Sequence, residues 1–155
     1  MATTKCGCNT VPGQQHGSDL LVTIGPTLIV DIGFDPKYKP GVGVRVPAPI
    51  PAITGMWALI DTGASECCID SILATQLGLP IVDKKQIAGV GGAQEVNIHL
   101  AQIHVPALDH TIYGMFAGVH LVAGGQMHRA LIGRTFLKSF DMVYTGSTGD
   151  VILSN

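Results

Sequence analysis

The chain has 155 residues and a formal net charge of −2 at pH 7, and 46% of its residues are hydrophobic but only 13% are charged. This length predicts a single domain with a core of its own. The charge argues against nucleic-acid binding, which needs clustered Lys and Arg. No apolar run approaches the roughly 18 residues of a membrane span and no signal-peptide region is visible, so we expect a cytoplasmic protein without membrane contact.

Residues 1–18 are polar and show no hydrophobic periodicity, which predicts a mobile N-terminal tail before one domain over residues 19–155. The tail contains Cys6, Cys8 and His16. A metal site usually needs three or four regularly spaced ligands, and no second cysteine pair completes one here, so we favour a plain tail over a metal site.

The segments 20–24 and 27–33 are apolar and β-branched and flank Gly25-Pro26, which predicts two short strands around a turn. Residues 35–51 are rich in Pro and Gly and predict an extended surface loop. This loop is longer than a typical connection. It either edges a binding site or a subunit contact, or is a tolerated insertion.

Residues 58–65 read Ala-Leu-Ile-Asp-Thr-Gly-Ala-Ser, so three apolar residues lead directly into Asp61 and a tight turn. This pattern predicts a carboxylate at the end of a buried strand, which costs free energy unless the group is hydrogen-bonded or paired. Taken alone, such an Asp most often caps a turn. Asp70 then predicts the N-cap of a helix over residues 71–77, which Gly78 and Pro80 end.

Residues 86–96 place glycines between β-type flanks and predict a hairpin with a mobile tip. In the strand predicted after it, the apolar phase slips near Ala101-Gln102, which predicts a bulge or bend. His99 and His104 fall on the polar phase, so we expect both to face solvent without a catalytic or metal role.

Residues 130–134 read Ala-Leu-Ile-Gly-Arg, and their first four match residues 58–61 in three positions. Gly133 stands where the first copy has Asp61, so the short internal repeat carries the acid only once. We also predict a strand over 111–116, a short helix after Gly133, and a hairpin formed by 141–144 and 150–153.

The segments 58–65, 86–96 and 130–134 resemble, in order and spacing, the active-site loop, the flap and the apolar-apolar-Gly strand of the retropepsins, the retroviral-type aspartic proteases. The helix at 71–77 makes the resemblance nearer to the cellular and bacterial members than to the viral enzymes. The resemblance implies an all-β, closed barrel-like acid-protease fold with one or two short helices that functions as a symmetric homodimer.

The resemblance also assigns the site. The catalytic residue is Asp61, and the residues that support its loop are Thr62, Gly63 and Ala64. The flap residues that would bind substrate are Ala88, Gly89, Val90, Gly91 and Gly92, and the cleft wall is formed by Leu131, Ile132 and Gly133. The partner of Arg134 stays open, with Ser65 and Glu66 in the matching stretch.

These features predict an aspartic endopeptidase that cleaves extended polypeptide with a water activated by an Asp pair shared between two subunits, without metal or cofactor. The alternative is a non-catalytic peptide-binding or dimerisation module with the same fold. All four cysteines are expected as free thiols. Cys67 and Cys68 are either small buried packing residues or a point where oxidation disturbs the loop.

Overall fold

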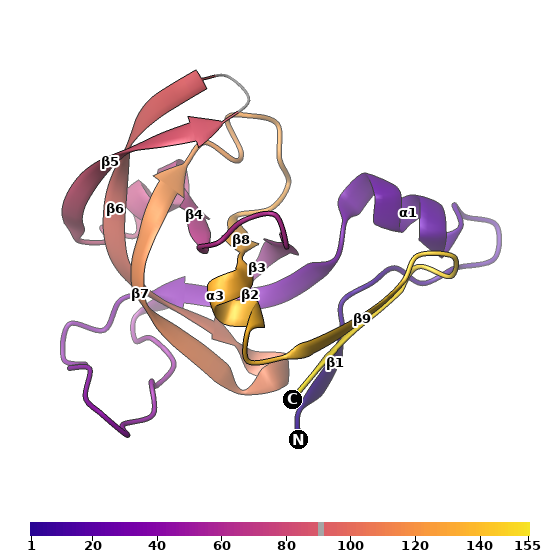
Figure 1. Cartoon of the computed structure of the whole chain (residues 1–155), viewed down its shortest axis with the longest axis horizontal. Helices are drawn as coiled ribbons and strands as arrows, with labels where there is room; N and C mark the ends of the chain where they lie inside the picture. Colours follow the sequence, from indigo (N-terminus) through magenta and orange to yellow (C-terminus); the bar gives the residue numbers. More distant parts are fainter. Residues whose placement is uncertain (90–91) are drawn as a thin grey trace.

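The computed structural model describes residues 1–89 and 92–155. In this part of the chain six strands close into a barrel in the order β2-β3-β8-β4-β7-β6, and β6 pairs again with β2 (Figure 1). Their bounds are β2 Thr27–Gly33, β3 Ala52–Ile60, β4 Cys68–Asp70, β6 Gly92–Val105, β7 His110–Val119 and β8 Ala130–Ile132. The predicted all-β, closed-barrel fold with short helices is confirmed.

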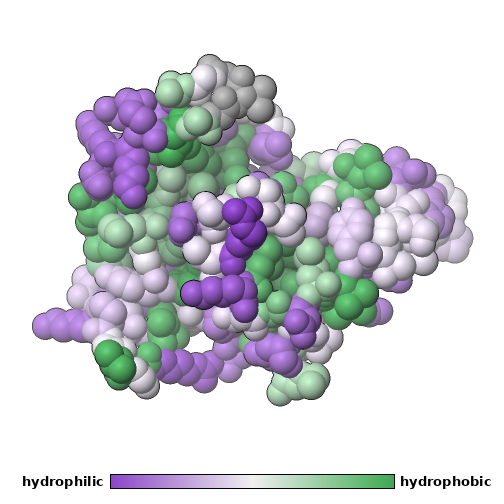
Figure 2. Space-filling view, viewed as in Figure 1, coloured by the Kyte–Doolittle hydropathy of each residue, from purple (hydrophilic) through white to green (hydrophobic). Residues whose placement is uncertain are grey.

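The barrel closes around β-branched and other apolar side chains, which pack well on a pleated surface. The fully buried ones include Val30, Ile32, Ile69, Ile103 and Ile132. Hydrophobic residues also reach the surface in several places (Figure 2). The exposed large side chains include Trp57, Met115 and Tyr144.

The two copies of the internal repeat lie side by side. Strands β3 and β8 run parallel, with Ala58 beside Ala130, Leu59 beside Leu131 and Ile60 beside Ile132. The predicted repeat therefore brings residue 61, at the end of one copy, next to residue 133, at the end of the other.

Helix α2 (Ser71–Gln76) confirms the predicted helix, and the carboxylate of Asp70 caps it by accepting the Leu73 N–H at 3.2 Å. Helix α1 (Gly17–Ile24) corrects the strand predicted at 20–24. Its first turn is capped by His16 Nδ1, which accepts the Ser18 N–H, and its end is closed by Gly25 at φ 80°. Leu21 points into the core from this helix, so its burial outweighs the β-branched composition.

A second, three-stranded sheet joins the two ends of the chain, which lie close together in Figure 1. Strand β1 (Thr3–Lys5) pairs with β10 (Asp150–Ser154), which pairs with β9 (Asp141–Thr145). The predicted C-terminal hairpin is thus confirmed. The expected tail differs, because β1 is hydrogen-bonded, Cys6 is buried, and the expected boundary after residue 18 falls inside α1.

The surface loop predicted at 35–51 is confirmed, and a buried side chain anchors it. Gln102 in β6 donates to the carbonyl of Pro47 at 2.9 Å and accepts the Asp35 N–H at 2.8 Å. Among the residues described, no helix has the length and apolar character needed to cross a bilayer.

We expected a bulge or a bend near residue 101 of β6, and the structure has no bulge there. The ladder of β6 with β7 runs unbroken from Ile98 to Val105, and the shift lies in β5 (Ile81–Gly89), between Ile81 and Asp83. The start of β6 pairs with β5, whereas residues 102–104 pair with β2. The two halves of β6 therefore have different neighbouring strands, which accounts for the change in which residues are buried. His99 is consequently buried, not solvent-facing, with Nδ1 3.2 Å from the carbonyl of Leu79.

Candidate active site

Asp61 lies at the end of β3 and is half buried. Its backbone N–H donates to the carbonyl of Ile132 at 3.0 Å, which fastens the loop to β8. Its side-chain Oδ1 accepts the backbone N–H of Gly63 at 2.9 Å. The carboxylate at the end of this strand thus has a hydrogen-bond donor within its own turn, which offsets part of the cost of its burial.

Helix α3 (Arg134–Leu137) holds the Asp61 loop by donating hydrogen bonds to carbonyl groups of the loop. The backbone N–H groups of Arg134 and Thr135 donate to the carbonyls of Ala64 at 2.9 Å and Ser65 at 3.0 Å. The guanidinium of Arg134 donates to the carbonyl of Thr62 at 2.8 Å. The partner of this side chain is therefore the backbone of the turn.

Gly133 allows this close approach of α3 and the loop. A Cβ at residue 133 would lie 2.4 Å from the Glu66 carbonyl oxygen and 3.0 Å from that of Ala64. The backbone N–H of Gly133 also donates to Cys67 Sγ at 3.3 Å. A side chain cannot stand at this position of the second repeat, which explains why glycine replaces the acid there.

A cleft of about 620 Å³ opens beside the loop. The loop contributes one wall, the β5–β6 hairpin a second, and β7 a third. The lining residues are Gly63, Ala64, Ser65, Glu66 and Cys68 from the loop and β4, Lys85, Ile87 and Ile98 from the hairpin, and Met115 and Ala117 from β7. This volume lies in the range of small-ligand sites.

The structure brings some of the predicted site residues together at this cleft. Gly63 and Ala64 line it, and Thr62 is exposed in the same turn. At the described end of the hairpin, Ala88 pairs with Ala93 and Gly89 with Gly92. Val90 and Gly91, also predicted as flap residues, lie outside the described residues.

The predicted cleft wall needs a correction. Ile132 is fully buried in the barrel core, so the prediction that it lines the cleft is wrong. Gly133 is buried behind the loop and acts on it through backbone contacts. Leu131 is half buried and is not among the residues that line the cleft in this single chain.

Sequence reasoning missed the side chains that β5 and β7 send into the cleft. Lys85 and Ile87 are two residues apart on β5, and Met115 and Ala117 are two apart on β7. Residues spaced by two share a face of a strand. That alternation, carried one residue beyond the predicted flap (86–96) and the predicted strand (111–116), was the signal that could have found them.

Cys68 lines the cleft but is unsuited to act as a nucleophile. Burial raises the pKa of its thiol to about 11, with smaller contributions from the neighbouring Cys67, Asp61 and Glu66. The thiol therefore stays protonated near neutral pH, and a thiolate is the reactive form. The loop is left with its carboxylates as the groups suited to acid–base chemistry.

Comparisons with known proteins bear on this geometry. No curated protein matches the chain. Among solved structures, an EIAV protease complexed with the inhibitor HBY-793 resembles it with a TM-score of 0.44 and 20% sequence identity, over 84% of this chain and 92% of that one. The model of the family described as "gag-polyprotein putative aspartyl protease" matches residues 54–139, from β3 through the end of α3. Since this match covers more than half of the chain, the protein belongs to that family of retropepsin-like aspartic proteases.

Proposed function

We propose that this chain is an aspartic endopeptidase that works as a symmetric homodimer and cleaves extended polypeptide. The observation that carries the proposal is the placement of Asp61, on a turn fixed by β8 and α3 and next to a cleft of about 620 Å³. Family membership supports protease chemistry in general.

The proposed chemistry needs two carboxylates. One, ionised, takes a proton from a bound water, which attacks the peptide carbonyl carbon, while the other, protonated, donates to the carbonyl oxygen. Collapse of the tetrahedral intermediate breaks the C–N bond as the first carboxyl gives the proton it took from water to the leaving nitrogen. The second carboxylate takes back a proton from a hydroxyl of the intermediate, which restores the pair. Two carboxylates about 3 Å apart cannot both ionise, so such a pair shares one proton and titrates as a unit.

The second carboxylate is assigned to a second copy of the chain. The sequence contains one Asp-Thr-Gly, and the matching position of the repeat is Gly133, which the loop contacts leave no room to replace. A twofold axis beside Asp61 would bring two copies of this residue together. We therefore expect the monomer to be inactive.

The remaining predicted residues have supporting roles in this proposal. Thr62 ties the two loops together through its hydroxyl, Gly63 lets the turn fold back, and Ala64 lines the cleft at the carboxylate. The hairpin around Ala88, Gly89 and Gly92 closes over the substrate and hydrogen-bonds its backbone, and Leu131 contacts substrate once the dimer has formed. An extended peptide suits such a cleft because it can add main-chain hydrogen bonds to strand edges.

The test is cleavage of an unfolded protein between pH 4 and 7 by the wild type and by Asp61→Asn. We expect cleavage by the wild type alone, with activity falling on dilution below the dimer dissociation constant. Asp141→Asn is the matched control, because this exposed Asp lies in β9 outside the cleft, and it should cleave like the wild type.

Two outcomes would contradict the proposal. Equal cleavage by Asp61→Asn would assign the chemistry to another residue or to a contaminant. A protein that sediments as a dimer and binds peptide but cleaves nothing would be a peptide-binding or dimerisation module.

The cytoplasmic location stays a prediction.

A further inference from the structure

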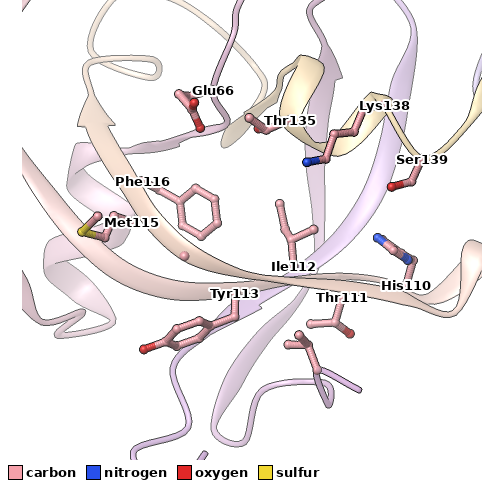
Figure 3. Close-up of a pocket in the computed structure, with 12 residues that line it drawn as sticks. Glu66, His110, Thr111, Ile112, Tyr113, Met115, Phe116, Thr135, Lys138 and Ser139 are labelled. Atoms are coloured by element: carbon pink, nitrogen blue, oxygen red, sulfur yellow. The ribbon is translucent and has the colours of Figure 1, made fainter. Parts of the chain in front are cut away.

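A second cavity lies directly beyond the cleft, between β7 and α3 (Figure 3). Its volume is about 350 Å³, and it shares two lining residues, Glu66 and Met115, with the cleft next to Asp61. The two cavities are therefore adjacent, with these two side chains at their common boundary. A peptide chain that leaves the cleft past Glu66 reaches the second cavity next.

The cavity has an apolar floor. Phe116 and Ile112 point into it from β7 in Figure 3, and Met115 closes its cleft end. His110 forms another part of the wall, and its ring packs edge-on against Phe136 and Phe140, with centroids 5.3 and 5.2 Å apart. Burial lowers the pKa of His110, so its imidazole is largely neutral near pH 7. His110 therefore lines the cavity as a largely uncharged side chain, and any positive charge in the cavity must come from another residue.

That positive charge comes from Lys138, which lies across the cavity from β7. Figure 3 shows its amino group directed over the cavity toward Thr135, and Ser139 adds a second hydroxyl to the same rim. The ion pairs found within residues 1–89 and 92–155 join Arg45 to Asp109 and Arg129 to Asp70, so the ammonium of Lys138 is not engaged in one. Glu66 stands at the opposite end, at the boundary with the cleft.

We propose that this cavity binds one distal side chain of the polypeptide substrate and that Lys138 makes the site selective for an acidic one. The aliphatic part of a Glu side chain would pack on Phe116 and Ile112, and its carboxylate would meet the ammonium of Lys138 and the hydroxyl of Thr135. The inference rests on the proposed endopeptidase, whose substrate class it narrows. In a symmetric dimer the cavity occurs twice, so the preference applies on both sides of the bond to be cleaved.

The experiment compares peptide pools that carry either Glu or Gln at one fixed position and random residues elsewhere, with the fixed position moved along the peptide. Glu and Gln have nearly the same shape, so a difference between the pools reports the charge. Binding is measured with the Asp61→Asn protein, and kcat/KM with the wild type. At one position on each side of the bond to be cleaved, we expect the affinity and kcat/KM for the Glu pool to exceed those for the Gln pool by about two- to fivefold. This is the range of an exposed ion pair.

Two further variants assign the effect. Lys138→Met removes the charge but keeps the length of the side chain, and it should bring the ratio of Glu to Gln to about one. Lys5→Met, at an exposed position of β1 that lines neither cavity, should keep the preference of the wild type. Because the exposed pair is screened by salt, the preference should also shrink as ionic strength rises.

The proposal is overturned if no position favours Glu, if no pool binds, or if Lys138→Met keeps the preference. Its failure is distinguishable from failure of the proposed enzyme. Cleavage without a charge preference would contradict the distal site but not the endopeptidase. A charge preference in binding to Asp61→Asn, together with no cleavage by the wild type, would contradict the endopeptidase and support the distal site.

Discussion

The guanidinium of Arg134 donates a hydrogen bond of 2.8 Å to the carbonyl oxygen of Thr62, the residue directly after Asp61. The contact joins the start of α3 to the turn that carries the carboxylate. Since the neighbouring carbonyls of Ala64 and Ser65 bind backbone N–H groups of the same helix, Arg134 completes a set of three contacts on one turn. The orientation of Asp61 therefore depends on residues more than 70 positions away in the sequence.

Replacement of Arg134 by Ala should loosen this turn. We expect a fall in kcat/KM of about tenfold or more, because small displacements of a reacting group are costly, with a loss of stability of about 1 kcal/mol. Steady-state kinetics and urea unfolding measure the two effects. Arg45→Ala, which removes an exposed pair with Asp109 and no hydrogen bond to the turn, is the control and should keep full activity. An equal fall in both variants would show that the turn does not depend on Arg134.

Replacement of Gly133 by Ala should destabilise the protein by about 1–3 kcal/mol, since the added Cβ would lie 2.4 Å from the Glu66 carbonyl and force the backbone apart. Urea unfolding gives the free energy. At Gly114 in β7 the nearest atom to an added Cβ is Phe116 Cζ at 3.7 Å, so Gly114→Ala is the matched control and should cost far less. Equal costs would mean that α3 and the loop can move apart freely.

Asp70 is fully buried and accepts three backbone N–H groups, from Leu73 at 3.2 Å, Leu121 at 3.1 Å and Val122 at 3.0 Å. Its carboxylate also lies 3.8 Å from Arg129. Asp70→Asn should cost about 2–4 kcal/mol, because an amide NH₂ would face donors and leave them unpaired.

Thermal or urea unfolding checks this cost. Asp141→Asn, at an exposed position, should change the free energy of unfolding by less than about 0.5 kcal/mol. A small effect of Asp70→Asn would indicate that α2 and the chain after β7 are held by packing alone.

Stability should fall as the pH is lowered below about 6.5, the ordinary pKa of histidine. Burial lowers the pKa of His128 and of His110 in the folded protein. The unfolded chain then binds protons at a higher pH than the folded one, so stability is retained above the unfolded pKa and is lost as the pH drops through the folded pKa values.

His128 is suited to test this linkage, since it is buried, its Nε2 lies 2.8 Å from the hydroxyl of Thr27, and its Nδ1 has no hydrogen-bond partner in the part of the chain described. Unfolding of His128→Gln at pH 7.5 and 5.5 should show a weaker pH dependence than that of the wild type. An unchanged pH dependence in His128→Gln would assign the acid sensitivity elsewhere.

The Asp61 loop and its partner strand were predictable because their signal is local. Ala58-Leu59-Ile60 and Ala130-Leu131-Ile132 repeat in sequence, and the structure pairs them residue by residue. Asp70 was likewise readable as a cap, because an N-cap acts on the helix that follows it within a few residues.

The errors arose where distant contacts decide the structure. The segment 20–24 is rich in β-branched residues, but Leu21 is buried and Gly25 closes a helical turn. Residues 3–5 look featureless because their partner strand, β10, lies at the other end of the sequence. His99 falls on a polar phase yet is enclosed, since the carbonyl of Leu79 supplies it with a hydrogen-bond partner.

Strand β5 stands apart from the ring that closes the barrel. In the described residues it is bonded to β6 and to no other strand, whereas the ring is completed by the pairing of β6 with β2 at residues 102–104. Bending of the β5–β6 hairpin therefore breaks none of the hydrogen bonds that close the barrel. Entry of a bulky chain into the cleft can be a local event, whose free-energy cost is set by the hairpin and is separate from the stability of the whole domain.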